Sequence, residues 1–105
     1  MKLIFAIIND DDVRFVSDAL ISKGIQATRL SSTGSFLKSG NTTLLICIDN
    51  EKVDEAIALI HDHCRRRKQL LPSSSLSGAF STYPVEINVG GATVFVTDVE
   101  RFEKF

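Results

Sequence analysis

The segment 28–41 carries the side chains in this sequence that are best suited to binding a small ligand. It combines several hydroxyl groups, a Thr-Gly turn, the apolar pair Phe36-Leu37 and the amide of Asn41, which offers both a donor and an acceptor. Such an amide can pair with the edge of a nucleobase, a phenylalanine can lie against the base, and backbone N–H groups near glycines can hold a phosphate. From spacing alone, an ordinary polar hairpin loop whose Phe and Leu fold back onto the core explains the segment equally well.

Motifs for catalysis are missing from the sequence. It contains neither a Walker-type phosphate loop nor the three spaced glycines of a dinucleotide fingerprint. No Ser/His/Asp or Cys/His constellation can be read from spacing, and the sequence has only two histidines. We therefore expect a binding protein and not an enzyme.

Residues that could hold a metal ion have simpler explanations. His61 and His63 stand two apart on a predicted helix, so they point in different directions and are expected to face solvent. The acids at 10–12 are expected to cap a helix, because no fourth ligand lies nearby in sequence. Cys47 and Cys64 are expected to be reduced core residues. The sequence predicts no metal site and no cofactor.

Size and charge limit the possible partners. A chain of 105 residues is expected to form one domain over 1–105. The formal net charge of −1 gives no long-range field, so no nucleic-acid polymer is expected as a partner. The cations at 65–68 could contact phosphates, but they are better explained as complementing the dipole of a helix C-terminus. The longest apolar run, 3–8, is far shorter than the roughly 20 residues of a membrane span and lacks a cleavage site, so we expect a cytoplasmic protein.

Hydrophobic patterning predicts strands at 2–8, 25–32, 41–49 and 84–99, the last of them bent at Gly90-Gly91. One helix is expected after the acids at 10–12 and a second after an N-cap at Asn50. The apolar stripes of these helices are Val13, Val16, Ala19 and Leu20 in the first and Val53, Ala56, Ile57, Ile60 and Cys64 in the second.

The remaining segments are expected to be loops and a tail. The turn-rich 33–40 and the serine-rich 69–83 are expected to be flexible loops, which in small domains are usually functional. The tail places Phe102 and Phe105 three apart, as in a last helical turn or an edge segment.

The predicted order is βαββαβ, which favours an α+β fold, the ferredoxin-like sandwich. Helices cover one face of such a sheet, yet the strands are apolar on both sides, so we expect a homo-oligomer to cover the second face. An RNA-binding domain of this fold would need aromatic residues on the central strands and a basic face, and neither is evident.

Two segments, TGSFLKSGNTTLLI at 33–46 and YPVEINVGGATVFV at 83–96, resemble the P-II-like cyclic di-AMP receptor family (PstA/DarA-like). The resemblance covers nearly the whole chain. It implies a P-II-like homotrimer that binds cyclic di-AMP in clefts between subunits, next to the flexible loops. The implied role is non-enzymatic signal transduction to a downstream protein, which the sequence does not identify.

The resemblance also implies the ligand-binding residues. Thr28 and Asn41 are implied to hydrogen-bond an adenine, and Gly90-Gly91 to allow close backbone approach. The segment Ser35-Phe36-Leu37 is implied to line the base pocket.

Three positions of the implied pocket depart from the usual family pattern. They are Gln26 where an Arg is common, Ser35 where a second Gly is common, and Cys47 where a Gly is common. Loss of the Arg would remove a charge-assisted contact worth roughly 1.5–3 kcal/mol. The alternatives are therefore a P-II-like module for another nucleotide or metabolite, and a protein-interaction trimer that has lost its ligand.

Overall fold

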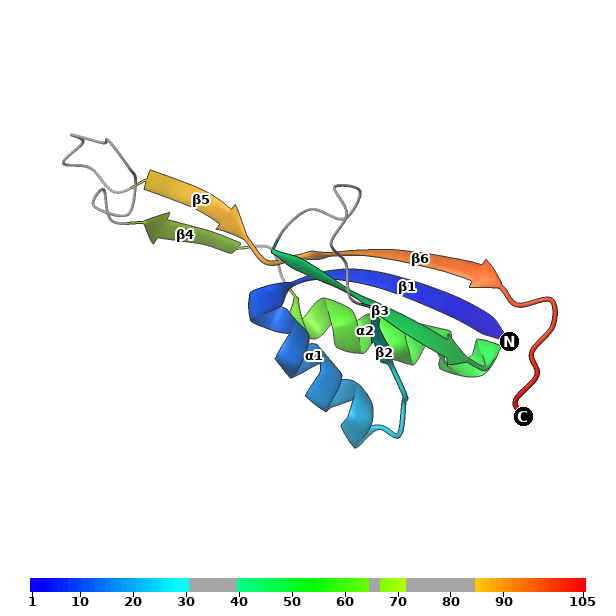
Figure 1. Ribbon diagram of the computed structural model, residues 1–105. Helices are drawn as coiled ribbons and strands as arrows, with labels where there is room; N and C mark the ends of the chain where they lie inside the picture. Colours follow the sequence, from blue (N-terminus) through cyan, green and yellow to red (C-terminus); the bar gives the residue numbers. More distant parts are fainter. Residues whose placement is uncertain (31–39, 65–66, 72–84) are drawn as a thin grey trace.

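The computed structural model describes residues 1–30, 40–64, 67–71 and 85–105 (Figure 1). Its helices and strands are β1 Lys2–Asn9, α1 Asp10–Ser22, β2 Thr28–Leu30, β3 Asn41–Ile48, the 3₁₀ helix η1 Asn50–Lys52, α2 Val53–His63, β4 Arg67–Leu71, β5 Val85–Val89 and β6 Ala92–Asp98. Across these ranges, no helix has the length and apolar character that crossing a bilayer requires.

The main sheet has four antiparallel strands in the order β2-β3-β1-β6. Both α1 and α2 lie against the same face of this sheet (Figure 1). The α+β fold and its βαββαβ order are thus as the sequence predicts. Between α2 and β6 the chain adds β4 and β5, which pair with each other in a separate antiparallel ribbon that extends away from the main sheet (Figure 1).

The core lies between the main sheet and the two helices. Alternate residues of β1 and β3 point into it, as the two-residue period of a strand requires. The buried residues are Ile4, Ala6, Ile8, Leu44, Ile46 and Ile48 from the strands, Val13, Val16, Leu20, Ala56 and Ile60 from the helices, and Ile25 and Cys64. The helical stripes predicted from the sequence therefore face the core at most of their positions.

The opposite face of the sheet, which we call the open face, is also apolar. Leu3, Phe5 and Ile7 of β1 lie on it half-buried, since they alternate with the core residues of that strand. Phe5 is flanked across the ladders by Leu45 of β3 and Phe95 of β6. Phe95 is 57% exposed. The expectation of an apolar second face is therefore confirmed.

Helix starts differ from the sequence prediction. Asn9 is the N-cap of α1, because its side chain accepts a hydrogen bond from the backbone N–H of Asp11 at 2.9 Å. The acids at 10–12 occupy the first turn instead, where negative charge complements the helix dipole. Asn50 does not cap α2 either, because it begins η1, and the N-cap position of α2 is Lys52, whose side chain makes no capping bond.

Strand boundaries also differ. Of the strand predicted over 25–32, residues 28–30 form β2, residues 25–27 do not belong to a strand, and residues 31–32 lie outside the described residues. The backbone N–H of Ile25 bonds to the carbonyl of Leu20, at the end of α1. The strand predicted over 84–99 is two strands, β5 and β6, in different sheets. Between them Gly90 and Gly91 have φ of 80° and 85°, a backbone conformation that glycine adopts without strain.

The loop prediction for 69–83 is wrong at 69–71, which belong to β4 and pair with β5. The rest of that segment lies outside the described residues, as does 33–39. The tail after β6 forms neither a helical turn nor an edge strand.

Candidate functional site

A hollow of about 340 Å³ lies at the β2 edge of the open face. The sheet contributes Thr28, Leu45 and Cys47, the segment before β2 contributes Gln26, and the C-terminal tail contributes Phe102, Glu103 and Lys104. We call it the β2-edge hollow. It combines apolar walls with an amide, a hydroxyl, a thiol and an ammonium group. It can therefore hold an aromatic ring and form hydrogen bonds with polar atoms at the edge of that ring.

The strand register explains why these residues meet. Thr28 is directly opposite Leu45 in the β2–β3 ladder. Leu45 and Cys47 share the open face, because the alternate residues Leu44 and Ile46 point into the core. Cys47 is exposed, so its predicted place in the core is wrong, whereas Cys64 is buried as predicted.

A second, smaller hollow of about 230 Å³ adjoins the first and shares Gln26 and Cys47 with it. Its other lining residues are Met1, Gly24, Ile25, Ile48, Asp49 and Lys52. Gln26 lines both hollows, of which one also holds Lys104 and Glu103 and the other Lys52 and Asp49. Residue 26 itself is neutral, and each hollow carries one lysine and one acid beside it.

The tail and the end of β6 carry ion pairs. Arg101 and Glu103 are joined at 2.8 Å, next to Lys104. Lys2 of β1 pairs with Asp98 of β6, its ladder partner. The hydrogen bond and charge of Lys2 lower the pKa of Asp98 below its usual value of 3.8.

Asn41 is the first residue of β3 and is half-buried. Its ladder partner is Asn9, the cap of α1. The residue before it, Gly40, accepts a hydrogen bond from the backbone N–H of Asp10 at 2.8 Å. Asn41 is about 20 Å from Cys47 along β3, at roughly 3.3 Å per residue, so the two lie at opposite ends of that strand.

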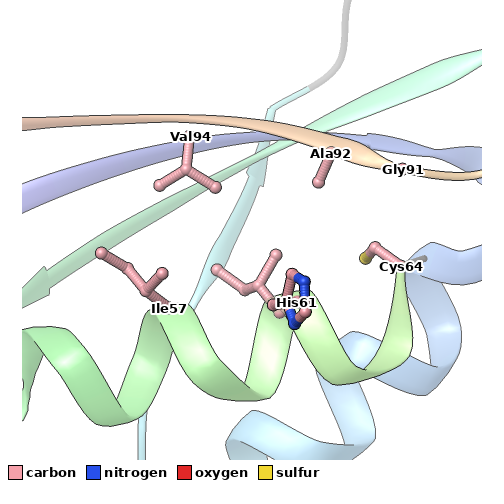
Figure 2. Close-up of a pocket in the computed structure, with 7 residues that line it drawn as sticks. Ile57, His61, Cys64, Gly91, Ala92 and Val94 are labelled. Carbon is pink, nitrogen blue, oxygen red and sulfur yellow. The ribbon is translucent and has the colours of Figure 1, made fainter. Parts of the chain in front are cut away.

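An apolar groove of about 680 Å³ runs between α2 and the β6 edge of the sheet. Figure 2 shows Ile57 and His61 of α2, and Cys64 directly after it, opposite Gly91, Ala92 and Val94. We call it the β6-edge groove. His61 and His63 are both exposed as predicted, but His61 also lines this groove.

Sequence reasoning missed His61 as a groove residue. The available signal is its spacing, since His61 follows Ile57 by four residues and precedes Cys64 by three, which places all three on one side of a helix. That a groove exists there depends on where β6 packs, which local sequence does not reveal.

The structure brings only part of the predicted site together in one copy of the chain. Gln26, Thr28 and Cys47 share the β2-edge hollow, while Gly91, next to Gly90, lines the β6-edge groove. β2 and β6 are the two outer strands of the sheet, about 14 Å apart at roughly 4.8 Å per strand. Ser35, Phe36 and Leu37 lie outside the described residues.

Metal binding finds no support in the described ranges, where no group of three or more His, Cys, Asp or Glu residues could hold an ion.

Comparison with known proteins gives two findings. The sequence model of a protein family described as "Cyclic-di-AMP receptor" matches residues 1–105. Among solved structures, the crystal structure of a functionally unknown protein from Pediococcus pentosaceus is similar, with a TM-score of 0.77 and 40% sequence identity. That similarity covers 99% of this chain and 96% of the other.

Proposed function

The chain belongs to the cyclic-di-AMP receptor family, and we propose that it binds cyclic di-AMP at the interfaces of a homotrimer and changes loop conformation for a partner protein. Membership supports cyclic di-AMP as the ligand and a non-catalytic signalling role. The interface, the trimer, the residue roles and the partner are the parts that we add.

The observation that carries the interface is the division of the predicted site between two edges of the sheet. Thr28 and Gln26 line the β2-edge hollow, and Gly91 lines the β6-edge groove. A ligand that touches both must bridge two copies of the chain, with the β2 edge of one beside the β6 edge of the next. Contacts between unlike edges form a closed ring when the rotation closes, and a trimer is one such ring.

The open face supports the same assembly. Phe5, Leu45 and Phe95 form an apolar row across three strands, and Phe95 is 57% exposed. Contiguous apolar surface of this kind marks an interaction site in a protein that does not aggregate. Three copies with their open faces turned toward a common axis would bury these rows.

The charge of the ligand also has a partner in the β2-edge hollow. Cyclic di-AMP carries two negative phosphates, and Lys104 lines the hollow that contains Gln26. A lysine in that place offers the phosphate a point charge, which offsets part of the loss from having Gln instead of Arg at position 26.

The conformational part of the proposal rests on where Asn41 lies. It follows Gly40 directly, at the end of the predicted loop 33–40, and Gly40 is bonded to Asp10. A ligand held by Asn41 therefore contacts the chain where that loop ends. We propose that cyclic di-AMP orders the predicted loops around 33–40 and 72–83 of a single domain over 1–105, and that a downstream protein in the cytoplasm reads the change.

Isothermal titration of the full chain with cyclic di-AMP tests the proposal, with ATP and cyclic di-GMP as controls and the oligomer mass measured in parallel. The expected result is a trimer with about three saturable sites that are selective for cyclic di-AMP. A well-folded trimer that binds none of the three nucleotides would contradict the proposal and favour a protein-interaction trimer. The departures from the family pattern at Gln26 and Cys47 would then explain the loss of the ligand. A protein that stays monomeric would contradict the interface site.

A further inference from the structure

Thr43 holds a buried hydroxyl that the structure leaves unpaired. Its Oγ1 has no hydrogen-bond partner within the part of the chain that is described, and the residue is only 4% exposed. An unpaired buried hydroxyl lowers stability, because the group loses its bonds to water and gains none in return. Valine has nearly the same shape and would avoid this cost.

The neighbouring residue, Thr42, gives a direct contrast. Its hydroxyl donates a hydrogen bond to the carboxylate of Asp10. Thr42 and Thr43 point to opposite sides of β3, since successive residues of a strand alternate. Among the described residues, the hydroxyl of Thr42 therefore has a partner and that of Thr43 has none.

Thr43 lies on the open face, between Asn41 and Leu45 on the same side of β3. Its ladder partners are Leu30 of β2 and Ile7 of β1. Leu30 is exposed and lies on the same side of β2 as Thr28. The cross-strand neighbours of Thr43 are therefore apolar. Of the predicted ligand residues, Asn41 is the next residue on the same face of β3, and Thr28 is the diagonal neighbour on β2.

The spacing suits a purine. Thr28 and Thr43 are diagonal neighbours across the β2–β3 pair, about 7–8 Å apart. Asn41 and Thr43 are two residues apart on one face, about 7 Å. A flat ring lying over Leu30 and Leu45 would meet hydrogen-bonding side chains on more than one edge.

We propose that the Thr43 hydroxyl is a specificity-determining contact, which hydrogen-bonds the edge of an adenine of the bound nucleotide. The Thr43 side chain is covered in the free protein, so contact with a ligand needs the groups that cover it to move aside and the hydroxyl to turn about χ1, for which threonine has more than one accessible rotamer. A hydroxyl both donates and accepts, and so it can serve either the amino group or a ring nitrogen of adenine. This inference rests on the proposed function and adds to it a residue that reads the base.

Thr43→Val tests the inference, with Thr43→Ser as the variant that keeps the hydroxyl and Thr42→Val as the matched control. Melting temperatures are measured without ligand, and dissociation constants are measured for cyclic di-AMP and for cyclic di-inosine monophosphate, which keeps the backbone but changes the base edge. Thr43→Val is expected to raise the melting temperature by about 4 °C. It is expected to weaken cyclic di-AMP binding about tenfold. The ratio of the dissociation constants for the inosine analogue and for cyclic di-AMP is expected to become smaller. Thr43→Ser should keep the affinity within about threefold, and Thr42→Val should lower the melting temperature.

Three results would overturn the inference. One is a Thr43→Val protein with the affinity of the unmodified chain, and another is an equal loss for both nucleotides, which would move the contact to the backbone of the ligand. The third is a lower melting temperature of ligand-free Thr43→Val, which would mean that the hydroxyl is already paired in the free protein. If the unmodified chain itself does not bind cyclic di-AMP, the proposed function fails and this inference falls with it. If the unmodified chain binds cyclic di-AMP and Thr43→Val binds it with the same affinity, only this inference is wrong and the proposed function stands.

Discussion

Asp10 and Thr42 tie the first turn of α1 to the start of β3, because the Thr42 hydroxyl donates a hydrogen bond to the Asp10 carboxylate. A second bond links the backbone N–H of Asp10 to the carbonyl of Gly40 at 2.8 Å. Asn41 lies between Gly40 and Thr42, both of which are hydrogen-bonded to Asp10. The backbone of Asn41 is therefore held in place in the free protein, which lowers the entropy lost when a ligand binds.

Replacing Asn41 by Ala should weaken cyclic di-AMP binding about tenfold or more and leave the oligomer intact. The amide can make two hydrogen bonds to a base edge, each worth about 0.5–1.5 kcal/mol. Calorimetry gives the affinity and light scattering the mass. Glu55→Ala, an exposed position on α2, is the control and should bind as the unmodified chain does. An unchanged affinity in Asn41→Ala would remove that residue from the site.

Replacing Gln26 by Arg should strengthen cyclic di-AMP binding by about one to two powers of ten. The arginine adds a charge-assisted contact worth roughly 1.5–3 kcal/mol in the β2-edge hollow. Because the gain is electrostatic, it should shrink as salt is raised from about 0.05 M to 0.5 M. Titrations at the two salt concentrations measure both effects. An equal gain at both concentrations would mean that the arginine acts by packing and not by charge.

Replacing Gly91 by Ala should lower both stability and ligand affinity. Gly91 lines the β6-edge groove and has a φ of 85°, where a residue with a side chain is strained by about 1–2 kcal/mol. Gly24→Ala is a matched control, since its φ is 72° but nothing lies within 4 Å of the new Cβ. Thermal unfolding should show a similar loss for both variants, and calorimetry should show weaker binding only for Gly91→Ala. Equal affinities in the two variants would place the groove outside the site.

The Lys2–Asp98 ion pair should make stability fall in acid. The pKa of Asp98 is lowered in the folded protein, so the pair stabilises the fold fully above the unfolded-state value of 3.8. This contribution is lost as the pH falls through the lower folded-state pKa. Between about pH 5 and pH 2.5, urea unfolding of Asp98→Asn should lose less stability than the unmodified chain loses. The difference should be small, because Asp98 is exposed. Asp18→Asn, at an exposed position on α1, should show the full loss.

Much of the fold can be predicted from the sequence, because its strongest signals are periodic. The stripe of Val13, Val16 and Leu20 predicts which side of α1 faces the core, and these residues are buried. The run at 2–8 predicts β1 to within a residue of its observed end. Pairing between distant segments is harder to predict. β4 is defined by its ladder with β5, and nothing in Arg67–Leu71 itself distinguishes a strand from a loop.

The site is less predictable than the fold. Local sequence identifies the apolar stretch around Cys47 but not which side of β3 that residue occupies, and the thiol is exposed on the open face. It also cannot show that Thr28 and Gly91 belong to opposite edges, because strand order is set by tertiary packing. That the Thr43 hydroxyl has no partner among the described residues depends on tertiary packing, which local sequence does not reveal.

The junction between β5 and β6 is a point about which the β4–β5 ribbon can rotate relative to the main sheet. Gly90 and Gly91 join two sheets that share no ladder, and β5 extends about 17 Å beyond them at roughly 3.3 Å per residue. A rotation of about 20° at the two glycines therefore displaces the far end of β5 by about 6 Å, while β6 stays in the main sheet. Gly91 is also part of the wall of the β6-edge groove. A molecule bound in that groove would contact the pivot between the two sheets, so a small rotation there would produce a larger displacement at the far end of β5.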